Sequence, residues 1–559
     1  VPCCPVAPSC TAVPTGRSTE ETKRMTNQII EETARRRTFA IISHPDAGKT
    51  TLTEKFLLYS GVLTAGAGSV AARRGGKSAA SDWQEIEQQR GISISSTVMR
   101  FPYRDCLLNL LDTPGHKDFS EDTFRVLAAT DAAIMVLDAG KGIEPQTRRL
   151  FEVCRERDVP IVTFINKWDR PGRDPWDLLD EIERDLILEP APVTWPVGES
   201  TTFDGVIDRL RNEYVQFTRV AHGSTMAPEL VSPIDSPALM DNALATEALE
   251  GVELLDAVDR VFDRKKFEAG ELSPVFFGSA LTNFGVGRLL DAVVDLVPSP
   301  PARLDINDDP RPIDSPFSGH VFKVQANTDK NHRDRIAFLR VASGRFERGM
   351  TIIHGPSKRS VTTKYVHSVQ GSDRETLDEA FPGDVIGLVN ANGFRPGDAV
   401  YVDEPVEWRP MPAFAPTNFM VARAKDTGKF KQFRSGVAQL DEEGVVQVLR
   451  IPDVGDQAPI FAAVGPLQFE VAKHRLENEF NAPVELSPTS YSVARVTDAE
   501  SIPLLRGLRG VEIVERSDGA IWALFESAFR VRQVAQDKPE ATLERLMADE
   551  AVDSFGRRV

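Results

Sequence analysis

Cysteine is scarce in this chain, with 5 cysteines among 559 residues, too few to form a disulfide framework in a protein of this length. Cys106 and Cys154 stand alone in apolar surroundings, as expected of reduced core thiols in a cytoplasmic protein. Cys3, Cys4 and Cys10 cluster in a Pro-rich opening, but no Cys or His pair follows at the spacing of a zinc site. The cysteines therefore predict neither a secreted, disulfide-bonded fold nor a metal centre.

Long apolar runs and net positive charge are also missing. No stretch approaches the about 20 apolar residues that a membrane-spanning helix needs, so the sequence predicts no membrane span. The formal net charge of −17 excludes a uniformly basic surface for non-specific nucleic-acid binding, although it permits local basic patches. The opening residues lack both the apolar stretch of a secretory signal and the arginines of a transit peptide. We therefore expect residues 1–35 to be a disordered extension.

What the chain does contain is a regular alternation of apolar runs and polar helical stretches over residues 36–300. The apolar runs are Arg37–Ser43, Cys106–Leu111, Ala132–Asp138 and Pro160–Ile165, and Thr50–Tyr59 is expected to be a helix. Such alternation predicts an α/β domain with a doubly wound parallel sheet, in which ligands bind at the carboxyl ends of the strands.

The alternation of strands and helices changes at two Pro-containing linker segments, Pro298–Pro312 and Pro410–Pro416. Between them, short β-prone runs separated by glycine turns predict a β-barrel over residues 313–408. Residues 412–559 mix helical and strand patterns, which predicts an α+β domain that ends in a polar helical tail. The runs in question are barrel strands at Gly319–Val324, Arg335–Val341, Met350–His354, Ser360–Val366 and Asp384–Leu388, helices at Lys429–Gln439 and Leu467–Asn478, a strand at Gln447–Arg450, and the tail at Gln533–Val559.

A first motif, SHPDAGKTT, lies between the first expected strand and the first expected helix. It matches the phosphate-binding pattern G-x-x-x-x-G-K-[ST], except that Ser43 replaces the first glycine. Backbone N–H groups of such a loop, with the helix N-terminus, present partial positive charge to phosphates. Gly48 would allow close backbone approach, Lys49 would reach the β- and γ-phosphates, and the Thr50 hydroxyl would bind Mg²⁺. The candidate nucleotide-binding residues are Ser43, His44, Pro45, Asp46, Ala47, Gly48, Lys49, Thr50 and Thr51.

A second motif, DTPGH, directly follows the apolar run that ends at Leu111. Asp112 is expected to hold Mg²⁺ through water, and the Gly115 N–H to contact the γ-phosphate. Taken alone, this motif is equally typical of a Pro-Gly turn. Its candidate residues are Asp112, Thr113, Pro114, Gly115 and His116.

Third and fourth motifs follow two later strands: NKWD, which begins at Asn166, and Ser279-Ala280-Leu281. A carboxylate at Asp169 can accept both the N1–H and the N2 amino hydrogens of guanine, a donor pair that adenine lacks. The motif therefore favours GTP over ATP, because a mismatched base leaves polar groups unpaired. Asn166 is expected to brace the loop, Lys167 to cover the base, and the Ala280 N–H to donate to the guanine O6. Four motifs in this order, each after an expected strand, indicate a GTP site.

Between the first two motifs lies a segment rich in Gly, Ala and Ser, Gly61–Ser81, which leads into QRGIS. We expect it to be mobile in some nucleotide states. The Ser93 hydroxyl could complete the Mg²⁺ shell only while the γ-phosphate is present, so that hydrolysis releases the segment. A solvent-facing strand hydroxyl is the alternative for Ser93.

Together these residues resemble the translational GTPases, since SHPDAGKTT, QRGIS, DTPGH and NKWD fit that class and a barrel follows the nucleotide domain. Longer stretches are similar to the bacterial class II release factors, the release factor 3 family. These stretches are Ser81–Pro102, Pro192–Gly198, His332–Val341 and Leu440–Val448, and the resemblance runs from about residue 35 to the end.

The resemblance implies a ribosome-dependent GTPase of translation termination, which promotes dissociation of class I release factors after peptide release. It implies GTP or GDP and Mg²⁺ as ligands, ribosomal RNA and proteins as partners, a cytoplasmic location, and a monomer off the ribosome. His116 would position the attacking water, and Asp46 would help to hold a monovalent cation near the phosphates. A surface histidine in a turn and a loop-capping carboxylate are the respective alternatives.

Basic residues also gather locally, and these clusters are either solvated faces or contacts for ribosomal RNA phosphates. One cluster comprises Arg423, Lys425, Lys429, Lys431 and Arg434, and the other comprises Lys330, His332, Arg333 and Arg335.

Three other functions fit part of the pattern. A translocase of the elongation factor G type needs two further domains, and none follows Val559 in this sequence. An ATP-dependent enzyme such as a kinase fits the phosphate loop but not Asp169. A ribosome-binding adaptor that binds GTP without hydrolysing it fits the motifs, provided that His116 has no catalytic role.

Overall fold

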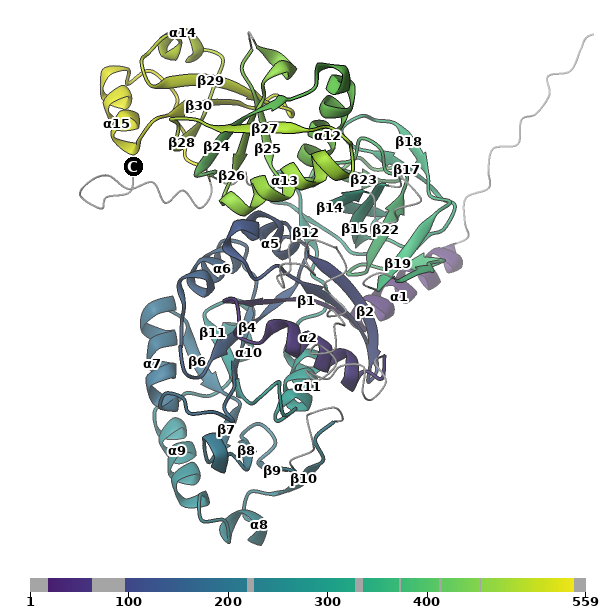
Figure 1. Cartoon of the computed structure of the whole chain (residues 1–559). Helices are drawn as coiled ribbons and strands as arrows, with labels where there is room; N and C mark the ends of the chain where they lie inside the picture. Colours follow the sequence, from purple (N-terminus) through teal and green to yellow (C-terminus); the bar gives the residue numbers. More distant parts are fainter. Residues whose placement is uncertain are drawn as a thin grey trace, which may run out of the picture.

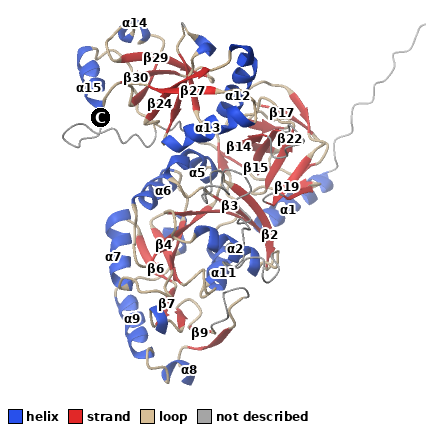
Figure 2. Cartoon of the chain, viewed as in Figure 1, coloured by secondary structure: helices blue, strands red, loops and turns tan. Residues whose placement is uncertain are grey.

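The computed structural model describes residues 19–62, 96–218, 226–326, 335–370, 373–411, 415–452 and 454–546. They form an α/β domain, a barrel-like β domain and a C-terminal α+β domain, which lie against one another (Figures 1 and 2). Among these residues, no helix is long and apolar enough to cross a membrane.

The first domain is built on a seven-stranded sheet in the order β2-β3-β1-β4-β5-β11-β6. All neighbours are parallel except the edge strand β2, which runs antiparallel to β3. Helices α2 and α11 cover one face through a core that includes Leu52 and Leu289, and α5, α6 and α7 cover the other through a core that includes Phe124 and Leu150. Helices on both faces of a largely parallel sheet confirm the doubly wound prediction.

The elements of this domain are β1 (Arg36–Ser43), α2 (Lys49–Tyr59), β2 (Thr97–Tyr103), β3 (Cys106–Asp112), η1 (Lys117–Phe119), α5 (Ser120–Leu127), β4 (Ala132–Asp138), α6 (Pro145–Glu156), β5 (Ile161–Asn166), α7 (Pro175–Leu186), β6 (Glu189–Pro192), β7 (Thr194–Val197), η2 (Ser200–Thr202), β8 (Gly205–Asp208), β9 (Glu213–Phe217), β10 (Glu229–Pro233), α8 (Pro237–Met240), α9 (Ala245–Ala257), α10 (Arg264–Glu268), β11 (Leu272–Phe277) and α11 (Val286–Leu296).

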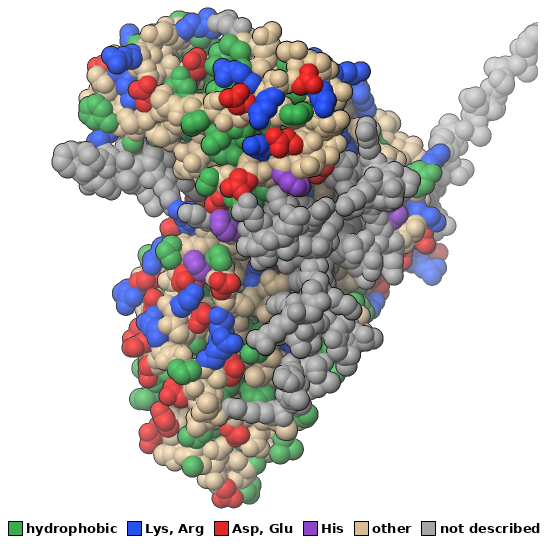
Figure 3. Space-filling model, in the orientation of Figure 1, with side chains coloured by type: hydrophobic (Ala, Val, Ile, Leu, Met, Phe, Trp, Pro, Cys, Tyr) green, Lys and Arg blue, Asp and Glu red, His purple; other side chains and the backbone are tan. Residues whose placement is uncertain are grey.

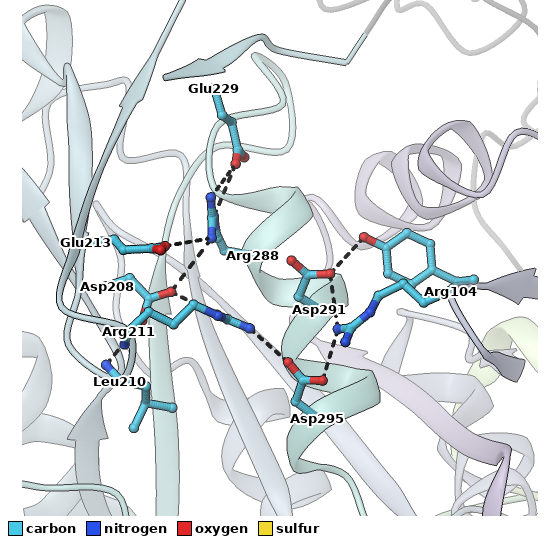
Figure 4. Close-up of polar contacts among 10 residues, drawn as sticks. Arg104, Asp208, Leu210, Arg211, Glu213, Glu229, Arg288, Asp291 and Asp295 are labelled. Carbon is cyan, nitrogen blue, oxygen red and sulfur yellow. Dashed lines mark hydrogen bonds and ion pairs between the residues drawn. The ribbon is translucent and has the colours of Figure 1, made fainter. Parts of the chain in front are cut away.

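A four-stranded antiparallel sheet, β10-β9-β8-β7, is inserted before β11. A charged network ties it to α11, the helix that follows the fourth motif (Figure 4). Arg288 of α11 pairs with Glu229 at 3.0 Å, and Arg211 joins Asp208 at 2.9 Å to Asp295 of α11 at 2.8 Å. Burial raises the pKa of the Glu229 carboxyl, although Arg288 opposes that effect. The network fixes the insertion beside the nucleotide domain.

The second domain is an eight-stranded antiparallel sheet with a buried apolar interior, and it contacts the first domain directly. Phe322, Phe338 and Val385 belong to the same apolar cluster as α5 and α6. The elements of the connecting segment and this domain are β12 (Arg303–Leu304), β13 (Pro310–Arg311), β14 (Ser318–Ala326), β15 (Arg335–Ser343), β16 (Phe346–Glu347), β17 (Thr351–His354), β18 (Ser360–Thr362), β19 (Val366–Gln370), β20 (Asp373–Thr376), β21 (Glu379–Ala380), β22 (Val385–Val389) and β23 (Ala399–Tyr401).

The third domain has a seven-stranded antiparallel sheet in the order β27-β24-β26-β25-β29-β30-β28. Helices α12 and α13 pack on it near one end of that order, and α14 and α15 near the other. Its elements are β24 (Asn418–Ala424), η4 (Thr427–Lys429), α12 (Phe430–Glu443), β25 (Gln447–Arg450), η5 (Gly455–Gln457), β26 (Ile460–Ala463), α13 (Pro466–Asn478), β27 (Val484–Pro488), β28 (Val493–Thr497), α14 (Ile502–Leu505), β29 (Val511–Arg516), β30 (Ile521–Phe525) and α15 (Ala528–Asp537).

Two expectations about the chain ends are wrong in part. The segment expected to be a disordered extension contains helix α1 (Thr19–Ala34), because Met25, Ile29 and Thr33 recur every fourth residue and so share one face. Ile29 and Thr33 are buried. At the other end α15 stops at Asp537, one residue before the Lys538-Pro539 pair, and proline disfavours helix in the residue that precedes it.

The barrel run Ser360–Val366 is not one strand but parts of two, β18 and β19, separated by an exposed turn at Tyr365. The other runs expected in the first two domains fall in strands whose ends differ by only a few residues. Residues 1–18, with Cys3, Cys4 and Cys10, and residues 547–559 lie outside the described part of the chain.

Candidate nucleotide site

The four motifs meet at one edge of the first sheet. They follow β1, β3, β5 and β11, and in the strand order these strands lie side by side with only β4 interposed. Because the strands are parallel, their carboxyl ends and the loops that follow share one edge. Residues as far apart in sequence as Ser43 and Leu281 are thereby brought into one loop cluster.

The phosphate loop depends on a glycine at position 48. Its φ of +104° lies in the left-handed region, and a Cβ there would come within 2.2 Å of Nδ2 of Asn166. Glycine is the residue that avoids both the strain and the collision. The Leu52 N–H donates to the Gly48 carbonyl at 2.9 Å, so α2 begins directly at the loop. The loop backbone is therefore shaped by contact with the third motif.

Asn166 links the first, third and fourth motifs. Its Nδ2 donates to the Ala47 carbonyl at 2.7 Å, and its Oδ1 accepts from the Ala280 N–H at 2.8 Å. The bracing role expected of Asn166 is visible in these contacts. The Ala280 N–H, expected to donate to the guanine O6, donates to Asn166 in this structure, and its contact with guanine stays a prediction.

Asp169 carries an unsatisfied acceptor. Its Oδ1 is buried and has no hydrogen-bond donor among the described residues. Trp168 holds the neighbouring backbone: its ring meets Phe277 edge-on at 4.8 Å, and its Nε1 donates to the Gly198 carbonyl at 3.1 Å. A buried carboxylate oxygen without a partner is uncommon in proteins. This arrangement fits a ligand that brings its own N–H donors.

Lys167 joins the third motif to two acceptors, one of which the sequence reasoning missed. Its Nζ donates to the Asp46 carbonyl at 2.6 Å and to Oδ2 of Asp138 at 2.7 Å. Burial raises the pKa of the Asp138 carboxyl, but hydrogen bonds from Lys167 and the Gly140 N–H outweigh burial and hold that pKa below its ordinary value. Asp138 could have been found, because it ends a parallel strand at the edge where the motifs meet.

Lys49 and Asp112 face each other across the site. The Lys49 Nζ lies 2.6 Å from Oδ1 of Asp112, and both side chains are buried. Thr113 anchors the second motif to β1 by donating to the Ile41 carbonyl at 2.7 Å. A Cβ on Gly115 would lie 3.9 Å from Cε of Lys49, so the two loops are in contact. An ammonium, a carboxylate and the half-buried Thr50 form a donor set that suits phosphate and Mg²⁺.

His116 stands at the end of the second motif with about a third of its side chain exposed (34%). Its Nδ1 lies 3.4 Å from Oδ1 of Asp118 and accepts from the Asp118 N–H at 3.3 Å. The Phe119 ring is 6.2 Å away between centroids. Sequence reasoning passed over Asp118, although a carboxylate two residues after the candidate catalytic histidine was a readable signal. Ser93, the third candidate Mg²⁺ ligand, lies outside the described residues.

Three family models match successive parts of the chain. Residues 34–299 match the elongation factor Tu GTP binding domain, residues 316–403 match elongation factor G domain 2, and residues 408–535 match the "Class II release factor RF3, C-terminal domain". Relatives named peptide chain release factor 3 are 48% identical in Synechococcus elongatus, over 92% of this chain and 94% of the relative, and 48% identical in Gloeobacter violaceus, over 91% and 97%. The chain belongs to the peptide chain release factor 3 family.

Family membership decides among the functions that the motifs left open. A relative from Symbiobacterium thermophilum, also named peptide chain release factor 3, is 45% identical over 92% of this chain and 98% of its own length. A solved structure from Thermus thermophilus shares the fold with a TM-score of 0.65 at 22% identity, over 89% of this chain and 74% of that one. This release factor 3 family member is a translational GTPase, so the kinase and translocase alternatives fall away.

Proposed function

We propose that this GTPase promotes the dissociation of class I release factors from the ribosome after peptide release. The observation that carries the proposal is that a guanine-type site and a C-terminal domain of the class II release factor type occur in one chain and touch each other. A change at the nucleotide can therefore reach the domain that is particular to this family. Protein switches signal in this way, through segments that hold one position only while a γ-phosphate is bound.

Within the site, each residue has a role that its chemistry supports. The Asp169 carboxylate, whose Oδ1 has no donor among the described residues, would accept the two N–H groups of guanine, and Lys49 would contact the β- and γ-phosphates. Thr50 directly, Asp112 through water, and Ser93 would hold Mg²⁺, which neutralises charge on the phosphates. Asp46, whose side chain is exposed, would help to hold a monovalent cation. These assignments need the Lys49–Asp112 contact to open when a nucleotide enters.

His116 would orient the water that attacks the γ-phosphate. With Nδ1 turned towards Asp118, Nε2 is the ring nitrogen left to face that water. Phosphoryl transfer depends largely on positioning and on electrostatic stabilisation, so a histidine that is out of place keeps the basal rate low. Ribosome binding would bring the histidine into place.

Ribosomal RNA would be contacted by the basic cluster around α12. Arg423, Lys425, Lys431 and Arg434 are exposed, and no carboxylate of the described residues pairs with them. Lys and Arg side chains stand on the outer surface of the third domain (Figure 3). In the other cluster, Lys330, His332 and Arg333 lie outside the described residues, and Arg335 pairs with Glu442. We propose a cytoplasmic protein that is monomeric off the ribosome.

The test uses ribosomes that hold a fluorescently labelled class I release factor after peptide release. Addition of this protein with GTP is expected to accelerate dissociation of the labelled factor, whereas His116→Ala with GTP should bind the nucleotide normally and lose ribosome-stimulated hydrolysis. An unchanged dissociation rate with the wild-type protein and GTP would contradict the termination function. Equal stimulated hydrolysis by His116→Ala would remove His116 from the mechanism.

A further inference from the structure

Asp118 connects the candidate catalytic histidine to another domain. Its side chain is 2% exposed, and its Oδ2 accepts from the Leu467 N–H at 2.9 Å, in the first turn of α13. Its Oδ1 lies 3.4 Å from Nδ1 of His116 and has no hydrogen-bond donor among the described residues. One carboxylate thus faces the imidazole with one oxygen and the third domain with the other.

The third domain accommodates Asp118 through a glycine. A Cβ on Gly465 would lie 2.0 Å from Cγ of Asp118, and 2.2 and 2.4 Å from its two oxygens. The backbone of Gly465 is extended, with φ −143°, so any residue could adopt it. The space that Asp118 occupies, and not backbone strain, therefore excludes a side chain at position 465.

The contact is the centre of a wider attachment between the two domains. Phe119 and Val471 are both buried in one apolar cluster. Arg125 of α5 donates to the Glu443 carbonyl at 3.4 Å, and the Gln447 amide donates to Glu121 at 3.2 Å. Four residues of the segment that follows His116 thus contact the third domain, namely Asp118, Phe119, Glu121 and Arg125.

We propose that Asp118 is the positioning residue through which the third domain sets the orientation of His116. The inference rests on the proposed role of His116 in hydrolysis. The N–H groups of a helix N-terminus favour a carboxylate, and hydrogen bonds to a charged acceptor are stronger than neutral ones. Oδ2 fixed in this way holds the Asp118 backbone in place, and the Asp118 N–H, which donates to Nδ1 at 3.3 Å, steadies the imidazole ring. Displacement of α13 by the ribosome moves this anchor and with it the histidine.

The experiment changes the contact from both sides. Asp118→Asn keeps the shape of the side chain and removes its charge, whereas Gly465→Ala places a methyl group where the carboxylate lies and leaves the first domain unaltered. Asn478→Ala, at the exposed far end of α13 and away from this contact, is the matched control. The same measurements are made on each single variant and on the double variant Asp118→Asn/Gly465→Ala. Ribosome-stimulated GTP hydrolysis is measured as a function of ribosome concentration, and GDP affinity and thermal unfolding are measured on the free protein.

Each single variant is expected to lower the stimulated kcat by about 10- to 100-fold, since displacement of a catalytic group by about 1 Å can have that effect. GDP affinity and the half-saturating ribosome concentration should stay unchanged, whereas a general structural defect would alter them. The double variant should lose no more than the worse single variant, because both changes break one contact. Additive losses, or a normal kcat in either variant that folds, would overturn the inference.

A separate control distinguishes the two proposals. If His116→Ala hydrolyses GTP on the ribosome as fast as wild type, the role of His116 falls and this inference with it. If His116→Ala is slow while Asp118→Asn and Gly465→Ala are normal, only the link through Asp118 is refuted.

Discussion

Asn166→Ala is the sharpest perturbation of the candidate site, because one amide holds three motifs together. The change removes the hydrogen bond to the Ala47 carbonyl and the one from the Ala280 N–H, which are 2.7 and 2.8 Å long. It also removes the atom against which Gly48 is packed. The phosphate loop and the fourth motif then lose their common anchor.

The size of the effect follows from these two bonds. A net hydrogen bond contributes about 0.5–1.5 kcal/mol, and a buried group left unpaired costs about 1–3 kcal/mol. Relaxation of the free loop recovers part of that loss, so we expect a net effect of about 2–4 kcal/mol. Nucleotide binding must bring the phosphate loop back to its wild-type conformation. The free energy lost in the variant therefore appears as a decrease in nucleotide affinity of about 30- to 1,000-fold.

The assay is equilibrium binding of fluorescent GDP and GTP, with both affinities expected to fall together. Asn478→Ala is the matched control, because Asn478 is exposed and donates one hydrogen bond, to the His474 carbonyl at 2.8 Å. Gly48→Ala should weaken binding as well, and less so in the Asn166→Ala background, where the collision is gone. Affinities for GDP and GTP within about twofold of wild type would refute the reasoning about this anchor.

Three further predictions concern selectivity, pH and partner binding. Asp169→Asn should shift preference from GTP towards xanthosine triphosphate in competition binding, and unchanged GTP preference would remove Asp169 from base recognition. Burial, reinforced by Arg303 and Arg340, holds the pKa of His320 well below its ordinary value, so the unfolded chain takes up a proton that the folded protein excludes. The free energy of unfolding should therefore fall by about 1.4 kcal/mol from His320 alone between about pH 7.5 and 5.5, and His320→Gln should remove this part of the pH dependence of urea unfolding. An unaltered pH dependence would contradict that assignment. Arg434→Gln should weaken ribosome binding and lower its salt dependence by about one unit in the log–log slope if the side chain contacts a phosphate; an unchanged slope would place Arg434 on a solvated face.

Local sequence determined much of this protein. The apolar run Ala132–Asp138 is a strand with those bounds, because buried parallel strands read as continuous apolar runs. The strand expected at Gln447–Arg450 also has those bounds. The ends of the chain were harder to predict. Helix α1 has few apolar residues, so its amphipathic pattern was weak, and the end of α15 depends on Pro539 more than on composition.

Within the site, the sequence predicted which residues gather but not how they pair. The motifs name Lys49, Asp112, Asn166 and Asp169 because each spacing fits a chemical task that nearby residues perform. Only the tertiary structure showed that Ala280 donates to Asn166, 114 positions away, and that Asp118 accepts from Leu467, 349 positions away. A motif is local and can be read along the chain, whereas a hydrogen bond forms between whichever groups the completed fold brings within about 3 Å. The sequence by itself thus determined the GTPase chemistry, and the tertiary structure decided which distant groups hold the residues of the site in place.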